Sequence, residues 1–372
     1  MSINNSHTVS CIKIANTLDQ GFRRAPMVDG KPSDSFVEYL KILFNEEEAK
    51  IVQYVNVFPN FLTSLQISDS SGMEHEKADT ILKKLNKKGC LLSFGNIFCL
   101  PIITILLNIT SGFSTEKFDT EKAADLYNDF FVKEKFYLYY QMSEEGTPTL
   151  RTIPVEETIA PGEKILKSEG AYDLIKNLNH NDLCLVPCPC RTRKEDIDER
   201  ECSGKFPVGS CIMLGPSALH FKKTGIGKPI SKREAITYFD KMTTLGLVGT
   251  TDNIECGNSV ICLCCGCCCS HLRGRTLWDT KAILPSNFIP YTDEQCKYCG
   301  ICSKTCLVDA IAVDAKLKTF AVDHDKCLGC GICILSCKSK ALKLRRLERA
   351  TMFKSQDNFY KTIASENKRV YL

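Results

Sequence analysis

The sequence predicts an α+β protein with several domains, and three observations lead to this class. Apolar residues at helical spacing and two short alternating runs occupy residues 34–110. A mixed helical domain with cysteine-rich loops is expected over 111–284, and a repeated four-cysteine spacing occupies 285–345. Residues 1–33 are polar and are expected to form an irregular arm, and residues 346–372 a tail. A chain of 372 residues is long enough for two or three domains.

Cysteine is unusually abundant, with 23 residues in the chain. The N-terminal segment lacks the apolar core of a secretory signal, so we expect a cytoplasmic protein, in which disulfides are disfavoured. The odd count and the crowded run CLCCGCCC also argue against bridges, so metal ligation is the expected role. The longest apolar stretch, residues 97–107, is too short to cross a bilayer, and we expect no membrane span.

The domain over residues 34–110 is expected to begin with helices and to end with a hairpin. Asn45 followed by three glutamates favours a helix start, because the side chain caps backbone N–H groups and acids suit the helix dipole. The next expected elements are a short helix over 60–68, a helix over 74–88 closed by Gly89, and a hairpin about Gly95.

Three helices closed by a hairpin resemble a winged helix, here over roughly residues 35–102. In DNA-binding members of that class the third helix enters the major groove and offers Lys or Arg to phosphates. Here that helix opens with Glu74, Glu76 and Asp79, which repel a phosphate backbone. We therefore expect a structural or protein-docking use and do not expect DNA as a partner.

Two longer helices are expected in the middle domain. Residues 121–142 have the pattern of one aromatic-rich helix whose rings pack a core. A second helix begins at Ser231, where Glu234 completes a capping box, and it ends before Gly246. Three isolated cysteines are expected to pack as small apolar core residues, namely Cys11, Cys90 and Cys99.

The strongest pattern is the spacing C-x2-C-x2-C-x3-C, which occurs twice with a separation of 31 residues (327 − 296 = 31). A loop of this spacing lets three sulfurs reach three irons of a cubane cluster, while the fourth ligand comes from elsewhere. The intervening residues 310–327 alternate apolar and polar residues about a turn, as a hairpin does. The two copies are Cys296, Cys299, Cys302 and Cys306, and then Cys327, Cys330, Cys333 and Cys337.

This repeat resembles that of bacterial-type ferredoxins with two 4Fe-4S clusters, over about 60 of the 372 residues. The resemblance implies that each copy lends its last cysteine to the other cluster. Cluster I then takes Cys296, Cys299, Cys302 and Cys337, and cluster II takes Cys327, Cys330, Cys333 and Cys306. Members of this family usually carry proline after each fourth cysteine, where this chain has Leu307 and Lys338. That departure is expected to alter solvent access or reduction potential and to leave both clusters in place.

Two further features of the repeat bear on packing and charge. Gly300, Gly329 and Gly331 are expected where a side chain would collide with the cluster or the backbone. Four thiolates around a cluster core leave each site at a charge of about −2. Two clusters would cancel the formal net charge of +4, so the basic balance is weak evidence for a nucleic-acid partner.

A second cysteine-rich region lies upstream, and its run of six thiols in eight residues is too crowded for one apolar core. It is expected to hold one or two additional iron–sulfur clusters. The simplest ligand sets are Cys188, Cys190, Cys202 and Cys211 for a third cluster, and Cys262, Cys264, Cys265 and Cys268 for a further cluster. Sharing of ligands between the two loops stays open.

Residues 150–340 resemble a family of uncharacterised 4Fe-4S proteins of anaerobic bacteria and archaea, on the motifs CPCR and CxCCxCCC. The resemblance implies an anaerobic redox role and no particular reaction. His271, beside the cysteine run, is expected to be a surface residue rather than a ligand or proton donor. Cations that either offset thiolate charge or form a solvated face are Arg191, Arg193, Lys194, Arg273 and Arg275.

These observations predict an iron–sulfur electron-transfer protein or subunit that passes electrons along several 4Fe-4S clusters to or from a partner redox enzyme in an anaerobe. One alternative is an oxidoreductase with a catalytic or substrate-binding atypical cluster in the middle domain. Another is a redox-sensing winged-helix regulator. Binding of small exogenous ligands would indicate the first alternative, and salt-sensitive, sequence-specific DNA binding the second.

Overall fold

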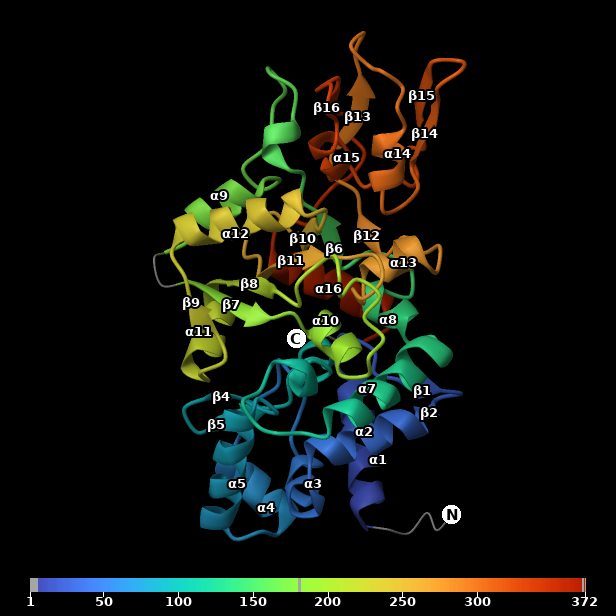
Figure 1. The fold of residues 1–372 in the computed structure, drawn as a ribbon. Coiled ribbons are helices and arrows are strands. Elements are labelled where there is room, and N and C mark those ends of the chain that lie inside the picture. The colour runs from blue at the N-terminus through green and yellow to red at the C-terminus, as the bar shows by residue number, and fades with distance from the viewer. Residues whose placement is uncertain (1–5, 180–181, 370, 372) are drawn as a thin grey trace.

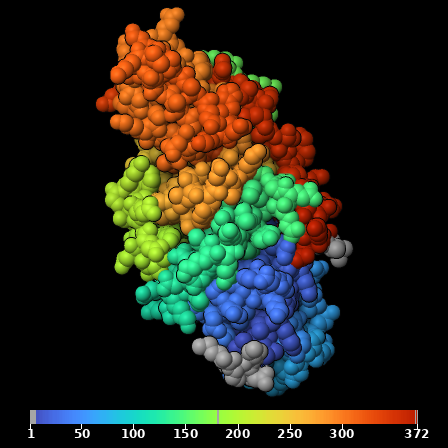
Figure 2. All heavy atoms as spheres, turned by 90° about the vertical axis from the view of Figure 1, so that its right-hand side faces the viewer, coloured from blue at the N-terminus to red at the C-terminus, as the bar shows by residue number. Residues whose placement is uncertain are grey.

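A seven-stranded sheet lies between two smaller units at opposite ends of an elongated molecule (Figures 1 and 2). The computed structural model describes residues 6–179, 182–369 and 371. The helices of the N-terminal residues form one end, and the segment from β13 to β16 forms the other (Figure 1). Among the described residues, no helix combines the length and the apolar character that crossing a membrane requires.

The N-terminal unit is mainly helical, with a three-stranded sheet of order β3-β5-β4. Its helices are α1 (Ser6–Asp19), α2 (Asp34–Leu43), α3 (Glu46–Val52), α4 (Ser64–Ser71), α5 (His75–Lys88) and α6 (Ile103–Leu106), with a 3-10 turn at Ile109–Ser111. Its strands are β1 (Met27–Val28), β2 (Lys31–Pro32), β3 (Leu62–Thr63), β4 (Leu92–Phe94) and β5 (Ile97–Cys99).

The prediction of an irregular arm over residues 1–33 is wrong for α1. Cys11, Ile14, Ala15 and Leu18 recur at the spacing of one helix face and are fully buried in the largest core cluster. Polar residues between them lowered the overall hydrophobicity and hid this stripe. Residues 1–5 lie outside the described part of the chain.

Local signals at the other helix ends are confirmed. Asn45 and Glu48 form a reciprocal capping box at α3, and Gly89 ends α5 in the left-handed conformation with φ of 88°. The hairpin pairs β4 with β5 about Gly95, as predicted. The short helix expected over 60–68 begins only at Ser64, because Leu62 and Thr63 pair with β5. The winged-helix resemblance stays a prediction.

The single helix predicted over 121–142 is broken into three pieces. They are α7 (Thr120–Asn128), a π-helical turn (Asp129–Lys133) and α8 (Tyr137–Gln141). Lys135 between them has a positive φ of 60°, which ends helical geometry. The break turns Phe130, Phe131 and Tyr140 into one aromatic cluster, so the predicted use of the rings in a core is confirmed.

The centre of the middle domain is a sheet of order β12-β6-β10-β11-β8-β7-β9, which the sequence pattern of this helical and mixed region did not place. Its neighbours are antiparallel except β12 and β6. The strands are short and covered on both faces, so they lack a simple polar alternation. The strands are β6 (Leu150–Thr152), β7 (Leu183–Pro187), β8 (Ser210–Leu214), β9 (Lys228–Pro229), β10 (Val248–Asp252), β11 (Val260–Cys264) and β12 (Ile283–Leu284).

Helices and turns connect these strands. They are a 3-10 turn at Glu156–Thr158, α9 (Ala171–Lys176), α10 (Pro189–Glu195), α11 (Gly215–Lys223), α12 (Lys232–Thr244) and α13 (Leu272–Thr276). The predicted start of α12 is confirmed, since Ser231 and Glu234 form a capping box. Gly246 follows this helix with a positive φ of 104°.

The last unit repeats one pattern twice, a cysteine loop leading into a short helix and then a strand. Its elements are β13 (Phe288–Thr292), α14 (Ile301–Thr305), β14 (Ile311–Asp314), β15 (Thr319–Val322), α15 (Ile332–Leu335) and β16 (Leu342–Arg346). β14 and β15 form the predicted hairpin, while β13 pairs with β16. The Arg346 guanidinium donates hydrogen bonds of 2.9 and 3.1 Å to the buried carboxylate of Glu169 in the middle domain. This ion pair joins the C-terminal unit to the middle domain.

The prediction of a tail over 346–372 is wrong for α16 (Gln356–Glu366). Phe359 and Ile363 lie one turn apart on its buried face and pack with Phe22 and Ile254. A hydrogen bond also links the end of this helix to the segment after α1, since the side-chain amide of Asn367 donates to the Phe22 carbonyl at 3.0 Å. The molecule is therefore a mixed α/β protein in which α16 packs against the segment that follows α1.

Candidate metal centres

The two cysteine loops of the C-terminal unit have the same backbone conformation. Tyr298 and Gly329 occupy equivalent positions, with positive φ of 50° and 65°, and Gly300 and Gly331 follow with 74° and 84°. In each loop the residue at the first of these positions donates its backbone N–H to the first cysteine, at 3.4 Å. Hydrogen bonds of this kind to thiolate sulfur stabilise iron–sulfur sites.

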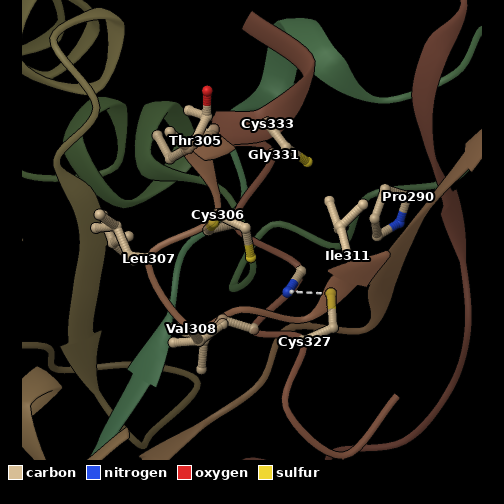
Figure 3. A pocket seen from close by; sticks show the side chains of 14 residues that line it. Pro290, Thr305, Cys306, Leu307, Val308, Ile311, Cys327, Gly331 and Cys333 are labelled. Atoms are coloured by element: carbon tan, nitrogen blue, oxygen red, sulfur yellow. Dashed lines mark hydrogen bonds between the residues drawn. The ribbon is translucent and has the colours of Figure 1, made fainter. Parts of the chain in front are cut away.

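The second loop encloses a cavity beside the middle sheet (Figure 3). Cys306, Cys327 and Cys333 surround this space together with Ile311 and Pro290 (Figure 3). The full set of thiols on its wall is Cys306, Cys327, Cys330 and Cys333, the four ligands predicted for cluster II. Burial and the neighbouring thiols raise the pKa of Cys330 to about 12 without a metal. The crossed assignment itself stays a prediction.

The first loop lies nearer the surface. Cys299 is exposed, and the other three thiols predicted for cluster I, those of Cys296, Cys302 and Cys337, are partly buried. Burial acts to raise the pKa of Cys337, but hydrogen bonds from Ser339 and from the backbone outweigh it and lower that pKa. The two predicted clusters therefore differ in solvent access, with cluster I on the outside.

The prediction that a side chain would collide at these glycines is confirmed, against protein atoms, for Gly329 and Gly331. A Cβ on Gly329 would lie 2.2 Å from the Phe288 carbonyl oxygen, and one on Gly331 would lie 2.3 Å from the Thr158 hydroxyl. A Cβ on Gly300 would meet nothing within 4 Å. Its positive φ of 74° favours glycine, and its collision with the cluster stays a prediction.

Ten of the twelve thiols of the middle domain fall into two groups that differ from both predicted sets. Six form a closed ring, in which each thiol interacts with two others. In order, this six-thiol ring consists of Cys188, Cys211, Cys262, Cys264, Cys269 and Cys190. The remaining four, called the tetrathiol group, are Cys202, Cys265, Cys267 and Cys268. Cys202 thus leaves the first predicted set, and Cys265 and Cys268 leave the second.

Strand geometry explains this grouping. Cys262 and Cys264 are two residues apart in β11 and so point to one face of the sheet, where Cys211 of β8 joins them. Leu263 between them belongs to the core on the other face, which also holds Cys202. The C-x-C spacing was therefore a signal that could have grouped Cys262 with Cys264 and separated them from Cys265. Cys267 and Cys269 were missing from the predicted sets.

Proton affinities alternate around the ring, because three of the thiols donate hydrogen bonds that stabilise the thiolate forms of the three between them. Hydrogen bonds from neighbouring thiols lower the pKa of Cys190 and Cys211 and bring that of Cys264 to about 6. The pKa values of the thiols between them are raised, those of Cys188, Cys262 and Cys269. The Sγ atoms of Cys264 and Cys269 are 3.1 Å apart. Six converging thiols of this kind are soft donors suited to iron or another thiophilic metal.

A cavity of about 230 Å³ adjoins the ring, and all six ring thiols line it. Polar side chains on its wall include Arg23, Asp252 and His271. His271, predicted to lie at the surface, is half-buried: its ring centre lies 4.9 Å from that of Tyr140, and it shares a hydrogen bond of 3.2 Å with Thr149. Burial lowers the pKa of His271 to about 3, so its imidazole is neutral near pH 7.

Three of the flanking cations are buried, so a solvated face does not describe them. Arg191 donates to the Val208 and Leu263 carbonyls at 2.6 and 2.7 Å. Arg193 lies 3.6 Å from the centre of the Tyr127 ring, and Arg273 lies 4.5 Å from that of Trp278. These guanidinium groups brace the loops and place positive charge near the thiols.

The isolated cysteines behave as predicted. Cys11, Cys90 and Cys99 are fully buried among apolar residues, and burial raises the pKa of each to about 12. They are therefore protonated and inert at neutral pH. Cys256 is exposed and donates to the Lys354 carbonyl at 3.1 Å.

A known protein family matches the segment that contains the second cysteine loop. Residues 320–343, which include Cys327, Cys330, Cys333 and Cys337, match the 4Fe-4S binding domain family, Fer4. No curated protein and no solved structure matches the chain. The match identifies an iron–sulfur protein and indicates a role in electron transfer.

Proposed function

We propose that this chain transfers electrons between a partner redox protein and a metal centre on the six-thiol ring, through two 4Fe-4S clusters in residues 285–345. The match to a 4Fe-4S binding domain supports the C-terminal part of this route. The six convergent thiols support an iron–sulfur centre at its other end. The expected setting is the cytoplasm of an anaerobe.

The burial of the two loops gives the route its direction. Cys299 of the first loop is exposed, so cluster I is the point at which a partner docks. Cys327 and Cys333 of the second loop are buried, and Cys327 packs in one core cluster with Val248 of the middle domain. Cluster II is therefore the relay between the surface and the interior.

The observation that carries the proposal is the packing of Val248. This residue pairs directly with Cys264 of the ring across β10 and β11. It also lines the cavity that the four predicted cluster II ligands enclose. Val248, Cys264, Cys269 and Cys327 belong to one hydrophobic core, so a single buried side chain bridges the two centres.

Removal of cluster II should interrupt this route. In Cys333→Ala protein the ring centre should be reduced more slowly by a protein electron donor than in wild-type protein, because the relay is lost. Rapid-freeze EPR of anaerobic samples would follow each centre separately. Equal rates of reduction in the two proteins would contradict the relay.

A second candidate function is catalysis at the ring centre, and the adjoining cavity favours it. The cavity has room for a small molecule beside the thiols, and its wall offers the cationic Arg23 and the carboxyl group of Asp252. Burial raises the pKa of Asp252, which brings it closer to the range of a proton donor.

An open metal position would be revealed by small exogenous ligands. Cyanide or carbon monoxide should alter the EPR spectrum of the ring centre and leave the spectra of clusters I and II unchanged, because only the ring borders such a cavity. Unchanged spectra for all centres would leave electron transfer as the function.

The regulator alternative predicts DNA binding, and α5 argues against it. Four of its five lysines form ion pairs with acids of the same unit, which lowers the positive charge available to phosphate. The ion pairs are Lys77–Glu47, Lys83–Asp79, Lys84–Glu48 and Lys88–Glu48. Gel-shift titrations at low salt should therefore show no sequence preference and no Kd below about 10⁻⁶ M. Tight, sequence-dependent shifts would restore the regulator hypothesis.

A further inference from the structure

The four sulfur atoms of the tetrathiol group lie close enough together to bind the same metal ion. All four sulfurs of Cys202, Cys265, Cys267 and Cys268 lie within 4.8 Å of one another. Cys202 is 3.7 Å from Cys268 and 4.0 Å from Cys265, and Cys267 is 3.5 Å from Cys268. Four thiolates bound at about 2.3 Å to one tetrahedral ion stand about 3.8 Å apart. The separations in this group are those of a site for a single ion.

A cubane cluster requires a wider arrangement. It binds its four thiolates through four different irons, which keeps the sulfurs further apart than one shared ion does. Within the part of the chain that the structure describes, no other group of three or more such ligands is this compact. The sets predicted for clusters I and II are therefore wider, and the tetrathiol group is a different type of site.

The surroundings of the group suit an anionic metal site. The Arg191 Nη2 atom is buried without a nitrogen or oxygen acceptor, and its guanidinium contacts the Cys265 sulfur. Arg200 contacts Cys202, and Arg273 lines a surface hollow together with Cys267. Four thiolates around a divalent ion carry a charge of about −2, which these guanidinium groups offset.

We propose that the tetrathiol group binds one tetrahedrally coordinated metal ion, zinc or iron, instead of an iron–sulfur cluster. Thiolates alone select thiophilic ions, and four protein ligands leave no open position, as in structural sites. The ion joins the loop that carries Cys202 to the turn after β11. Cys269, the next residue after the group, belongs to the six-thiol ring, so the ion also anchors that edge of the ring.

Metal and sulfide analysis of anaerobically purified full-length protein tests this site. Cys267→Ala, at a half-buried position, should lose about one zinc or one iron per chain with acid-labile sulfide unchanged, and the element lost identifies the ion. Cys256→Ala, at an exposed cysteine outside both groups, should lose neither. A loss of about four irons and four sulfides would show a cubane and overturn the proposal. An unchanged metal content would overturn it as well.

A measurement on the wild-type protein keeps the proposal testable if Cys267→Ala does not accumulate. X-ray absorption at the zinc edge should show a shell of four sulfur neighbours at about 2.3 Å. If the protein contains no zinc, its oxidised form should show the EPR signal of a mononuclear ferric ion. Absence of both signatures would overturn the single-ion site.

Discussion

Cys337→Ala protein should lose cluster I, the cluster bound by the first cysteine loop, and retain cluster II. The reason is the crossed ligand pattern, in which Cys337 of the second copy completes the set of Cys296, Cys299 and Cys302. Iron analysis should show a loss of about four irons per chain. EPR of the reduced protein should show the loss of the signal of the more exposed cluster.

The assignment has a matched control and a clear opposite result. Cys256→Ala removes a cysteine that belongs to none of the thiol groups and should leave both EPR signals intact. Loss of the cluster bound by Cys327, Cys330 and Cys333 in the Cys337→Ala variant would show that each copy keeps its own fourth ligand.

Gly329→Ala should have the second largest effect, the selective loss of cluster II. The new methyl group would lie 2.2 Å from the Phe288 carbonyl oxygen and 2.4 Å from the Ser286 hydroxyl, so the second loop must move away from β13. The backbone N–H of Gly329 would then lose its bond to Cys327. Reduced-protein EPR and iron content measure the loss.

Gly300→Ala is the matched control for this change. Gly300 shares the positive φ of Gly329 but has open space around its Cβ position. The Gly300→Ala change should lower the free energy of unfolding only by the strain of an alanine in the left-handed conformation, about 1–2 kcal/mol. Both clusters should stay in place. Equal losses in the two variants would mean that backbone strain, and not the contact with Phe288, limits the second loop.

The sequence predicted the cysteine loops of the C-terminal unit more fully than any other part of the chain. Their spacing is local, so the four-cysteine repeat and the hairpin between its two copies could be found without the tertiary fold. Helix ends at Asn45 and Ser231 were also predictable, because a cap depends on residues within one turn. Signals of this kind need no knowledge of the tertiary fold.

The middle domain could not be predicted in the same way. The six-thiol ring joins Cys190 to Cys269, and this contact depends on the order β11-β8-β7 within the sheet. The placement of Cys202 with Cys268 depends on a loop that packs on the opposite face. Neither pairing leaves a trace in the local spacing of cysteines, although the alternation of Cys262 and Cys264 along one strand did carry part of the information.

The packing of α16 against the segment after α1 has a consequence for how the protein is made. Phe22 finds its partners Phe359 and Ile363 only after residue 363 has left the ribosome. At a synthesis rate of about 5–20 residues per second, the 341 residues between them (363 − 22 = 341) take roughly 20–70 s. The segment after α1 therefore waits for α16, and metals must reach the thiols of a chain in which these two segments have not yet packed together.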